Sequence, residues 1–409
     1  MRRIFIPVVI LFSIFCFPLS GEEFVYKFAS GNKYRIVSSV SEDVYIDSVL
    51  SHHAEILNRI AVTVESVENG RARHRAVFDT AEKADAVKSG GGGIKDGTGG
   101  SFTWAREYES IFEKDSTGVF TIDKQYFMPV VRNVPVFPRK NLSPGETWKF
   151  QGHEVHDFRD SFGITEPYYI PFTADYSFLG YREWKGKEYP AVSVRYLIDE
   201  RPPKAAGLLW PLRIRGASDQ VVYWDPELGQ TRSYTETFSV LFELSNGRVI
   251  EYRGQAEAEL QKVESMEKSS LARAVAEAIE ESKVADTSVR VTDEGVVIAL
   301  ENIQFSPDSA VLRPSEREKL NRIGEILNRY PDRDILVGGH TALAGTAEGR
   351  EQLSRERAAE AADYLIRNGV RTADRVIVQG YGAGKPLAGN TTEAGRRRNR
   401  RVEITILEN

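Results

Sequence analysis

The stretch GGHTALAGTAEGREQLSRERA, residues 338–358, decides how the C-terminal part of the chain is interpreted. It has the pattern of a ligand-binding loop that runs into a helix carrying Arg350 and Arg357. Arginines suit the carboxylate of an amino-acid-like ligand, because the guanidinium group binds carboxylates through paired hydrogen bonds. An acidic side chain is expected beside them for the ligand's amino group, and Ala342 stands at that position. The stretch therefore predicts the frame of a binding site that lacks one of its charges.

A buried strand and a helix flank this loop. The strand is DILVGG, residues 334–339, which is short and apolar. The helix runs through LSRERAAEAADYLIRNG, residues 353–369, and its predicted end is Asn368-Gly369, a pair that suits a helix C-cap. RVIVQGYG (375–382) and RVEITIL (401–407) are predicted strands that follow.

The chain before the loop supplies another helix and strand. Pro314 is followed by Ser315-Glu316-Arg317-Glu318, which predicts that a helix begins there with a capping box. VRVTDEGVVIAL, residues 289–300, predicts a strand pair or one bent strand. Together these patterns predict an α+β domain of βαβαβ type over residues 286–409, with its helices on one side of a sheet.

Residues 262–285 differ in character from both of their neighbours. Leu271, Val275 and Ile279 recur at four-residue spacing among alanine, glutamate and lysine, which predicts an amphipathic helix. We expect this helix to connect the C-terminal domain to the region before it.

Residues 22–261 are rich in aromatic and β-branched residues with frequent turn signals. Asn69-Gly70 and Asn246-Gly247 predict hairpins with tight type I′ turns, and Lys185-Gly186 predicts another hairpin. The region is therefore predicted to be a large antiparallel β structure, a curved sheet or half-barrel. The glycine-rich stretch 89–101 is expected to be a flexible loop, either between two β units or inserted in one.

The first 21 residues have the pattern of a secretory signal peptide. Two arginines precede an apolar run from Ile4 to Phe17, and small residues follow at Ser20 and Gly21. The alternatives are an uncleaved membrane anchor or a lipid-attachment site at Cys16, which the bulky Phe15 disfavours. We expect cleavage near Gly21 and a location in the periplasm or cell envelope. Association with the outer membrane stays open.

Composition narrows the classes of function. The 409 residues carry a formal net charge of -5, which argues against a dedicated nucleic-acid-binding protein. Cys16 is the only cysteine, so removal of the signal would leave no disulfide and no thiolate metal site. No pattern of catalytic residues is evident, and we expect a non-enzymatic protein without a metal or cofactor.

The C-terminal motifs together resemble the peptidoglycan-binding domain of the OmpA, Pal and MotB family. The resemblance covers about residues 290–409 and rests on several motifs in the same order. They are NIQFSPDSAVLRPSEREKL, GGHT, LSRERAAEAADYLIRNGV and VIVQGYGAGKPLAGNTTEAGRRRNRRVEITI. It implies a periplasmic domain that recognises the diaminopimelate of cell-wall peptide. In this family the run GRRRNRR, residues 395–401, leads into the last strand, so we expect no nucleic-acid binding there.

The resemblance also implies roles for single residues. In the family, an aspartate after the His-Thr pair holds the ligand's ammonium group, and an arginine in the Leu-Ser-x-x-Arg-Ala motif holds its carboxylate. The arginine is present as Arg357, the aspartate is replaced by Ala342, and Arg350 replaces a family asparagine. The frame of the predicted site consists of His340, Thr341, Ala342, Gly345, Arg350, Leu353, Ser354 and Arg357.

These departures predict that peptidoglycan is bound weakly or not at all, and that Arg357 takes a simple anionic ligand instead. The leading interpretation is an envelope linker or scaffold whose β region meets another envelope protein or a lipid. Two alternatives stay open: a carrier of a ligand or lipid in the β region, and a tether that recognises a variant wall peptide. A MotB-like stator would need a membrane helix with a carboxylate, which the run Ile4–Phe17 lacks.

Overall fold

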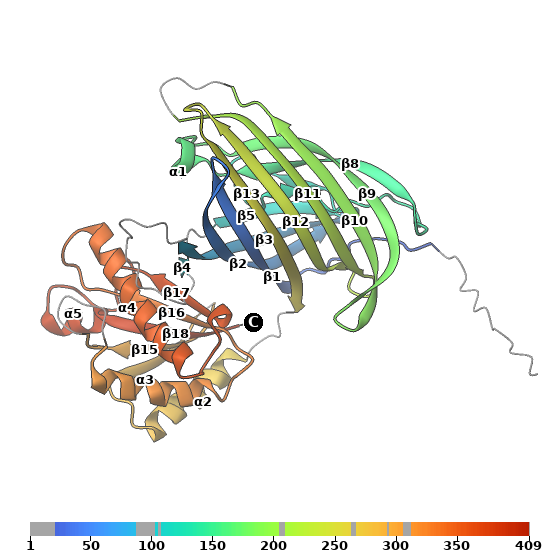
Figure 1. Cartoon of the computed structure of the whole chain (residues 1–409). Helices are drawn as coiled ribbons and strands as arrows, with labels where there is room; N and C mark the ends of the chain where they lie inside the picture. The colour runs from blue at the N-terminus through green and yellow to red at the C-terminus, as the bar shows by residue number, and fades with distance from the viewer. Residues whose placement is uncertain are drawn as a thin grey trace, which may run out of the picture.

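The computed structural model describes residues 21–86, 103–104, 108–203, 209–262, 267–292, 294–305 and 312–408. The predicted signal segment up to residue 20, the lipidation candidate Cys16 and the glycine-rich stretch 89–101 lie outside these ranges. Two parts follow each other along the described chain: a large β unit, then a smaller domain of strands and helices (Figure 1). None of the described helices is both long and apolar enough to span a membrane.

The β unit is a single 13-stranded antiparallel sheet, as its aromatic and β-branched composition and its frequent turn signals predict. Its order is β6-β5-β3-β2-β1-β13-β12-β11-β10-β9-β8-β7, with β4 paired to β3. Strands before and after the glycine-rich stretch therefore belong to one sheet. The strands are β1 Lys33–Ile46, β2 Val49–Glu68, β3 Arg71–Ala86, β4 Thr103–Trp104, β5 Tyr108–Asp115, β6 Phe120–Ile122, β7 Val131–Arg132, β8 Thr147–His156, β9 Tyr168–Trp184, β10 Lys187–Glu200, β11 Pro211–Asp225, β12 Gln230–Leu244 and β13 Val249–Lys262.

Two of the three predicted hairpin turns have the expected geometry. Asn69-Gly70 and Lys185-Gly186 have positive φ at both residues, as a type I′ turn requires. The type I′ prediction for Asn246-Gly247 is wrong, because only Gly247 has positive φ (84°). The Leu244 and Arg248 backbones pair across a three-residue loop, so a single glycine in the left-handed region closes this hairpin.

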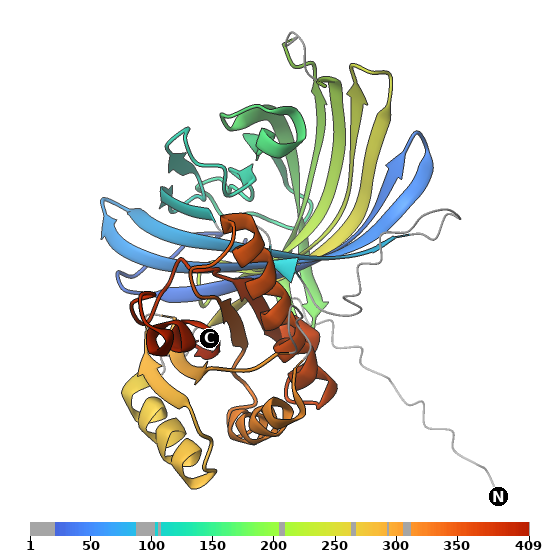
Figure 2. The ribbon, with the colours of Figure 1, turned by 90° about the vertical axis from the view of Figure 1, so that its left-hand side faces the viewer.

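The sheet curls until its two edge strands approach each other, so it is nearly closed as a barrel (Figure 2). The segment between β6 and β7 crosses the remaining gap. The Asn133 side chain accepts a hydrogen bond from the Phe120 backbone at one edge (2.9 Å). Arg132 is buried and donates to the carbonyls of Tyr126 (2.6 Å) and Pro129 (3.2 Å), which fixes the segment at the other edge.

Aromatic side chains fill one end of the curled sheet. The extended segment 22–28 runs inside it and contributes Phe24, which stacks on Phe137 with ring centroids 4.8 Å apart. Tyr26 meets Trp224 edge-on at 4.9 Å. Because these rings are buried and in mutual contact, this end of the β unit is a packed core.

The C-terminal domain has the predicted α+β fold with a five-stranded sheet in the order β14-β15-β18-β16-β17. Only β16 and β17 are parallel. Alternate residues of the sheet and the inner faces of α2, α3 and α4 share one apolar core, so these helices cover one side. The elements are α2 Lys268–Glu281, β14 Thr287–Val291, β15 Gly295–Glu301, α3 Pro314–Leu327, β16 Ile335–His340, α4 Ala347–Arg367, β17 Val376–Gly380, α5 Glu393–Asn399 and β18 Arg401–Leu407.

The start of α3 depends on local sequence, whereas α2 is held by packing against the C-terminal domain. The capping-box prediction for α3 is wrong: Arg313 is the N-cap, makes no side-chain cap bond, and Pro314 occupies the first turn. Proline at this position needs no N–H partner and presets the helical φ, which suffices to start the helix. Within the predicted connector, α2 buries Val275 and Ile279 in the core of the C-terminal domain.

The β unit and the C-terminal domain are joined through a buried carboxylate, Asp334. Arg35 Nη1 of β1 and Arg59 Nη2 of β2 lie 3.6 and 3.4 Å from Asp334 Oδ2. Arg375 of the C-terminal domain donates to Asp334 Oδ1 (2.9 Å), and the Asp334 side chain is 12% exposed. Leu57 of β2 also belongs to the apolar core that contains the helices. The two parts therefore share both an ion cluster and apolar contacts.

Candidate functional site

Two glycines bring the predicted loop against α4. A Cβ on Gly339, near the end of β16, would lie 1.9 Å from the Ser354 carbonyl oxygen. A Cβ on Gly380, at the end of β17, would lie 2.7 Å from the Glu351 carbonyl oxygen. Because only glycine permits these approaches, the helix packs directly on the ends of both strands, where the loop begins.

Hydrogen bonds then tie the loop to its surroundings. The Thr341 backbone N–H donates to the Gly382 carbonyl (2.8 Å), and the Gly382 N–H donates to Ser354 Oγ (2.9 Å). Ser354 is fully buried and also donates to the Glu351 carbonyl (2.7 Å). Thr341, Ser354 and the loop after β17 are thus held in one rigid frame. Thr341 Oγ1 is buried in this frame without a hydrogen-bond partner among the described residues.

The position that lacks an acid is buried, and its basic neighbour is used locally. Ala342 is 7% exposed and directly follows the fixed Thr341. Gly345 has φ of +76°, which turns the loop toward the helix. Arg350 Nη1 donates to the Gly345 carbonyl (2.6 Å), so part of its hydrogen-bonding capacity closes the loop. Neither the Ala342 side chain nor the Arg350 side chain can accept a hydrogen bond from an ammonium group.

Arg357 lies about two turns further along α4 than Arg350. Its guanidinium carbon is 4.9 Å from the centroid of the Phe305 ring, a cation–π contact. Leu353 is half-buried on the same helix.

The other end of the site frame is anchored by Glu403, which sequence reasoning missed. Arg290 and Arg401 donate to its two oxygens at 2.7 and 2.6 Å. His340 Nε2 is 3.5 Å from Oε2, so this contact is weaker than the two arginine bonds. Burial opposes ionisation of Glu403, but these cationic neighbours hold its pKa below the usual range. Burial lowers the pKa of His340, which stacks on Tyr381 with ring centroids 4.9 Å apart.

One sequence signal for this cluster was available. In β18 the polar residues Arg401, Glu403 and Thr405 alternate with apolar ones and are all buried. A charged pair two residues apart on one strand face indicates mutual pairing. The arginine run 395–401 is likewise used inside the domain, since Arg398 contacts Glu301 (3.1 Å) and Arg401 contacts Glu403.

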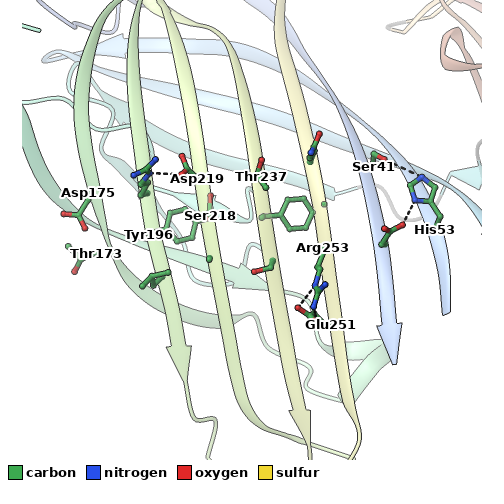
Figure 3. Close-up of a pocket in the computed structure, with 18 residues that line it drawn as sticks. Ser41, His53, Thr173, Asp175, Tyr196, Ser218, Asp219, Thr237, Glu251 and Arg253 are labelled. Atoms are coloured by element: carbon green, nitrogen blue, oxygen red, sulfur yellow. Dashed lines mark hydrogen bonds and ion pairs between the residues drawn. The ribbon is translucent and has the colours of Figure 1, made fainter. Parts of the chain in front are cut away.

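A surface depression lies on the outer face of the β unit, across strands β9 to β13, β1 and β2 (Figure 3). Its volume is about 1260 Å³. The charged side chains in it pair with each other or with neighbours. The pairs are Arg195–Asp219 (2.8 Å), Arg253–Glu251 (2.7 Å), His53–Asp43 (2.8 Å) and Lys149–Asp175 (2.7 Å). These paired groups leave the depression a solvated polar surface rather than a site with converging charges.

Among the residues that the structure describes, no group of three or more histidine, cysteine, aspartate or glutamate side chains is arranged to hold a metal ion.

Comparisons with known proteins agree with the geometry of the C-terminal domain. The model of the OmpA family matches residues 304–400. The probable lipoprotein YiaD of Escherichia coli is 38% identical over 135 residues, which are 31% of this chain and 61% of that protein. The peptidoglycan-binding protein ArfA of Mycobacterium tuberculosis is 39% identical over 104 residues, 25% of this chain and 32% of that protein. The match therefore spans only part of each relative.

A solved structure, the cell wall anchor of the T6SS from Pseudomonas aeruginosa, has 31% sequence identity and a TM-score of 0.30. The match covers 35% of this chain and all of that one. Other curated relatives include outer membrane protein A of Bordetella avium, 35% identical over 103 residues. The curated relatives, a probable lipoprotein and an outer membrane protein among them, confirm the predicted envelope location.

Proposed function

Because the C-terminal part of this chain is an OmpA family domain, we propose that the protein is a non-catalytic envelope linker or scaffold whose wall-peptide site has lost its ammonium-binding acid. The proposal rests on Ala342, which is buried in a loop that hydrogen bonds of Thr341, Gly382 and Ser354 hold in place. The methyl side chain of Ala342 has no hydrogen-bond acceptor, and the neighbouring Arg350 adds positive charge.

The expected loss of affinity follows from the missing interaction. A hydrogen bond between charged groups contributes about 1.5–3 kcal/mol, so its absence weakens binding of a zwitterionic ligand about tenfold to a hundredfold. Arg350 increases the loss, because its guanidinium repels an incoming ammonium group. Peptidoglycan containing diaminopimelate is therefore bound weakly or not at all.

The other half of the site keeps its charge. Arg357 lies over Phe305 and fulfils the role of a carboxylate-binding cation in this proposal. The preferred ligand is a simple anion without a nearby amine. A variant wall peptide that offers a carboxylate alone would satisfy the same requirement, and the protein would then act as a tether to that wall.

Cell-wall binding of the whole mature chain tests the proposal. We compare the natural sequence with Ala342→Asp/Arg350→Asn in a pull-down with peptidoglycan that contains diaminopimelate. The natural sequence is expected to stay in the supernatant, and the double variant to sediment with the wall. The control is Ala344→Asp, which adds the same charge at an exposed position two residues away and is expected to bind no better.

Tight binding by the natural sequence would contradict the proposal. If neither protein binds while circular dichroism shows both folded, the loop geometry differs from that of a wall-binding site, and the scaffold function stands without any wall contact. Binding of the natural sequence to a wall that lacks free amines, but not to ordinary wall, would identify the variant-wall tether.

A further inference from the structure

A second site is present inside the β unit, away from the OmpA family domain. It is a cavity of about 350 Å³ between the curled strands, within the size range of small-molecule pockets. Its apolar wall is formed by Tyr34, Ile36, Ile60, Phe78, Phe120 and Met128. Most of these side chains are only half-buried, unlike the packed aromatic rings at the other end of the sheet.

Two cations line this cavity, Arg232 and Lys114, and Arg232 is already paired with Glu259 (3.0 Å) in the same lining. Along β5, Ser110, Phe112 and Lys114 share a face because side chains alternate in a strand, and the first two are buried. Lys114 Nζ lies 3.6 Å from the centroid of the Tyr26 ring and 5.1 Å from that of Phe120. Burial lowers the pKa of Lys114 to about 7, although its neighbour Asp115 acts in the opposite direction.

The carboxylates near Lys114 are committed to other groups. Asp115 accepts hydrogen bonds from the backbone N–H groups of Thr117 (2.9 Å) and Val119 (3.1 Å) in the following turn. Across the cavity, Glu236 accepts from Ser218 (2.6 Å) and Gln220 (3.1 Å). Among the described residues, no carboxylate is within ion-pair distance of the Lys114 ammonium group.

We propose that this cavity binds a single-chain amphiphile with an anionic head, whose head pairs with Lys114 and whose chain lies against Tyr34, Ile36, Ile60 and Phe78. An ammonium group in an apolar pocket is costly unless a counter-charge accompanies it, and an anionic ligand supplies that charge. The cavity is at the small end of the ligand-pocket range, which suits one acyl chain rather than two. Free fatty acids and lysolipids share this chemistry.

Displacement of a fluorescent fatty acid, 11-(dansylamino)undecanoic acid, from the whole mature chain tests the proposal at pH 6.5. Competitors with similar chains are dodecanoate, dodecanol, dodecyltrimethylammonium and lauroyl-lysophosphatidylglycerol, each below its micelle concentration. Dodecanoate or the lysolipid is expected to bind at least about tenfold more tightly than dodecanol, as for a charge-assisted hydrogen bond. Whichever anion binds more tightly identifies the source of the ligand.

Variants separate the head contact from the chain contact. Lys114→Met is expected to abolish the preference for anions and to keep binding of dodecanol, whereas Lys114→Arg retains the preference. Ile60→Trp fills the cavity and is expected to reduce binding of all competitors at least about tenfold. Lys149→Met removes an exposed lysine that pairs with Asp175 outside the cavity, and is expected to change nothing.

Three results would overturn the proposal. They are equal affinities for dodecanoate and dodecanol, an unchanged anion preference in Lys114→Met, and unchanged binding in Ile60→Trp. Circular dichroism of each variant confirms that it is folded before its binding is interpreted.

Discussion

Replacing Lys114 with methionine should stabilise the protein without ligand, by an amount that depends on pH. The substitution keeps the length of the side chain and removes a positive charge from the apolar cavity. No carboxylate among the described residues pairs with that charge, so its removal relieves a desolvation cost that no ion pair offsets.

The pKa of Lys114 sets the upper limit of the effect. Lowering this pKa from 10.5 to about 7 corresponds to about 5 kcal/mol, at 1.36 kcal/mol per pKa unit. The cavity is large enough for water, and the Tyr26 ring attracts the ammonium group, so both lower the cost of the charge. We therefore expect Lys114→Met to increase the free energy of unfolding by about 2–3 kcal/mol at pH 6.

The sign of the pH dependence follows from proton binding. Between pH 7 and about 10, the unfolded chain keeps a proton on Lys114 that the folded protein has released. The stability of the natural protein therefore rises with pH relative to the variant, by at most about 1.4 kcal/mol per pH unit. Below pH 7 the difference is constant, and near pH 10 it has largely disappeared. His74, with a pKa lowered by burial to about 4, does not titrate in this window, and burial raises the pKa values of Tyr26 and Tyr34 above 10.

Urea unfolding followed by tryptophan fluorescence measures this difference at pH 6, 8 and 10. All five tryptophans of the chain lie between residues 104 and 224, so the signal reports on the β unit alone. Lys149→Met serves as the matched control. The reasoning is refuted if Lys114→Met is less stable than the natural protein at pH 6, or if the difference does not shrink between pH 7 and pH 10.

Three further substitutions test contacts on which the fold depends. Asp334→Asn should lower the free energy of unfolding by about 3–5 kcal/mol, because it leaves three arginines without their shared carboxylate. The two parts should then unfold separately, which is seen as fluorescence and circular dichroism transitions that do not coincide. The control Asp332→Asn, at an exposed position, should have neither effect. Gly339→Ala should cost about 3 kcal/mol or more in thermal unfolding, since its Cβ would collide with the Ser354 carbonyl; an unchanged melting temperature would disprove this contact. Glu403→Gln should cost about 3 kcal/mol above pH 5. This difference should shrink as the pH falls below the ordinary glutamate pKa of 4.5, because the unfolded chain then binds a proton at Glu403 that the folded protein does not; urea titrations at pH 3.5 and 7 can check this.

The C-terminal domain was predictable from sequence because its identity is written in short local motifs. The strand before the loop, the helix after it and the C-cap at Asn368-Gly369 all depend on neighbouring residues, and the structure contains each of them. The capping box failed because Pro314 satisfies the helix start by itself. The alternation of Arg401 and Glu403 in β18 was a readable signal, but the contact of Glu403 with Arg290 escaped prediction because the two residues are 113 positions apart and no local signal links them.

The β unit shows the limit of local reasoning more clearly. Asn69-Gly70 and Asn246-Gly247 have the same two letters, yet loop length gives them different turns. The alternation of Ser110, Phe112 and Lys114 places a lysine on an inward face, which sequence alone can show. That this lysine lines a cavity depends on strands β1, β2, β12 and the segment after β6, whose spatial arrangement is not encoded near residue 114.

The pairing of β1 with β13 has a consequence for how the chain matures. The paired residues run from Tyr34 with Lys262 to Ile46 with Ile250. β1 therefore cannot form this pairing until a strand more than two hundred residues further along the chain has been synthesised. The inner segment also waits, since the Lys27 backbone bonds to the Gly229 carbonyl. A chain that emerges from the ribosome N-terminus first cannot complete this unit until its last strand is released. Contacts so distant in sequence close slowly, and the edge of β1 leaves its backbone N–H and C=O groups unpaired during that interval.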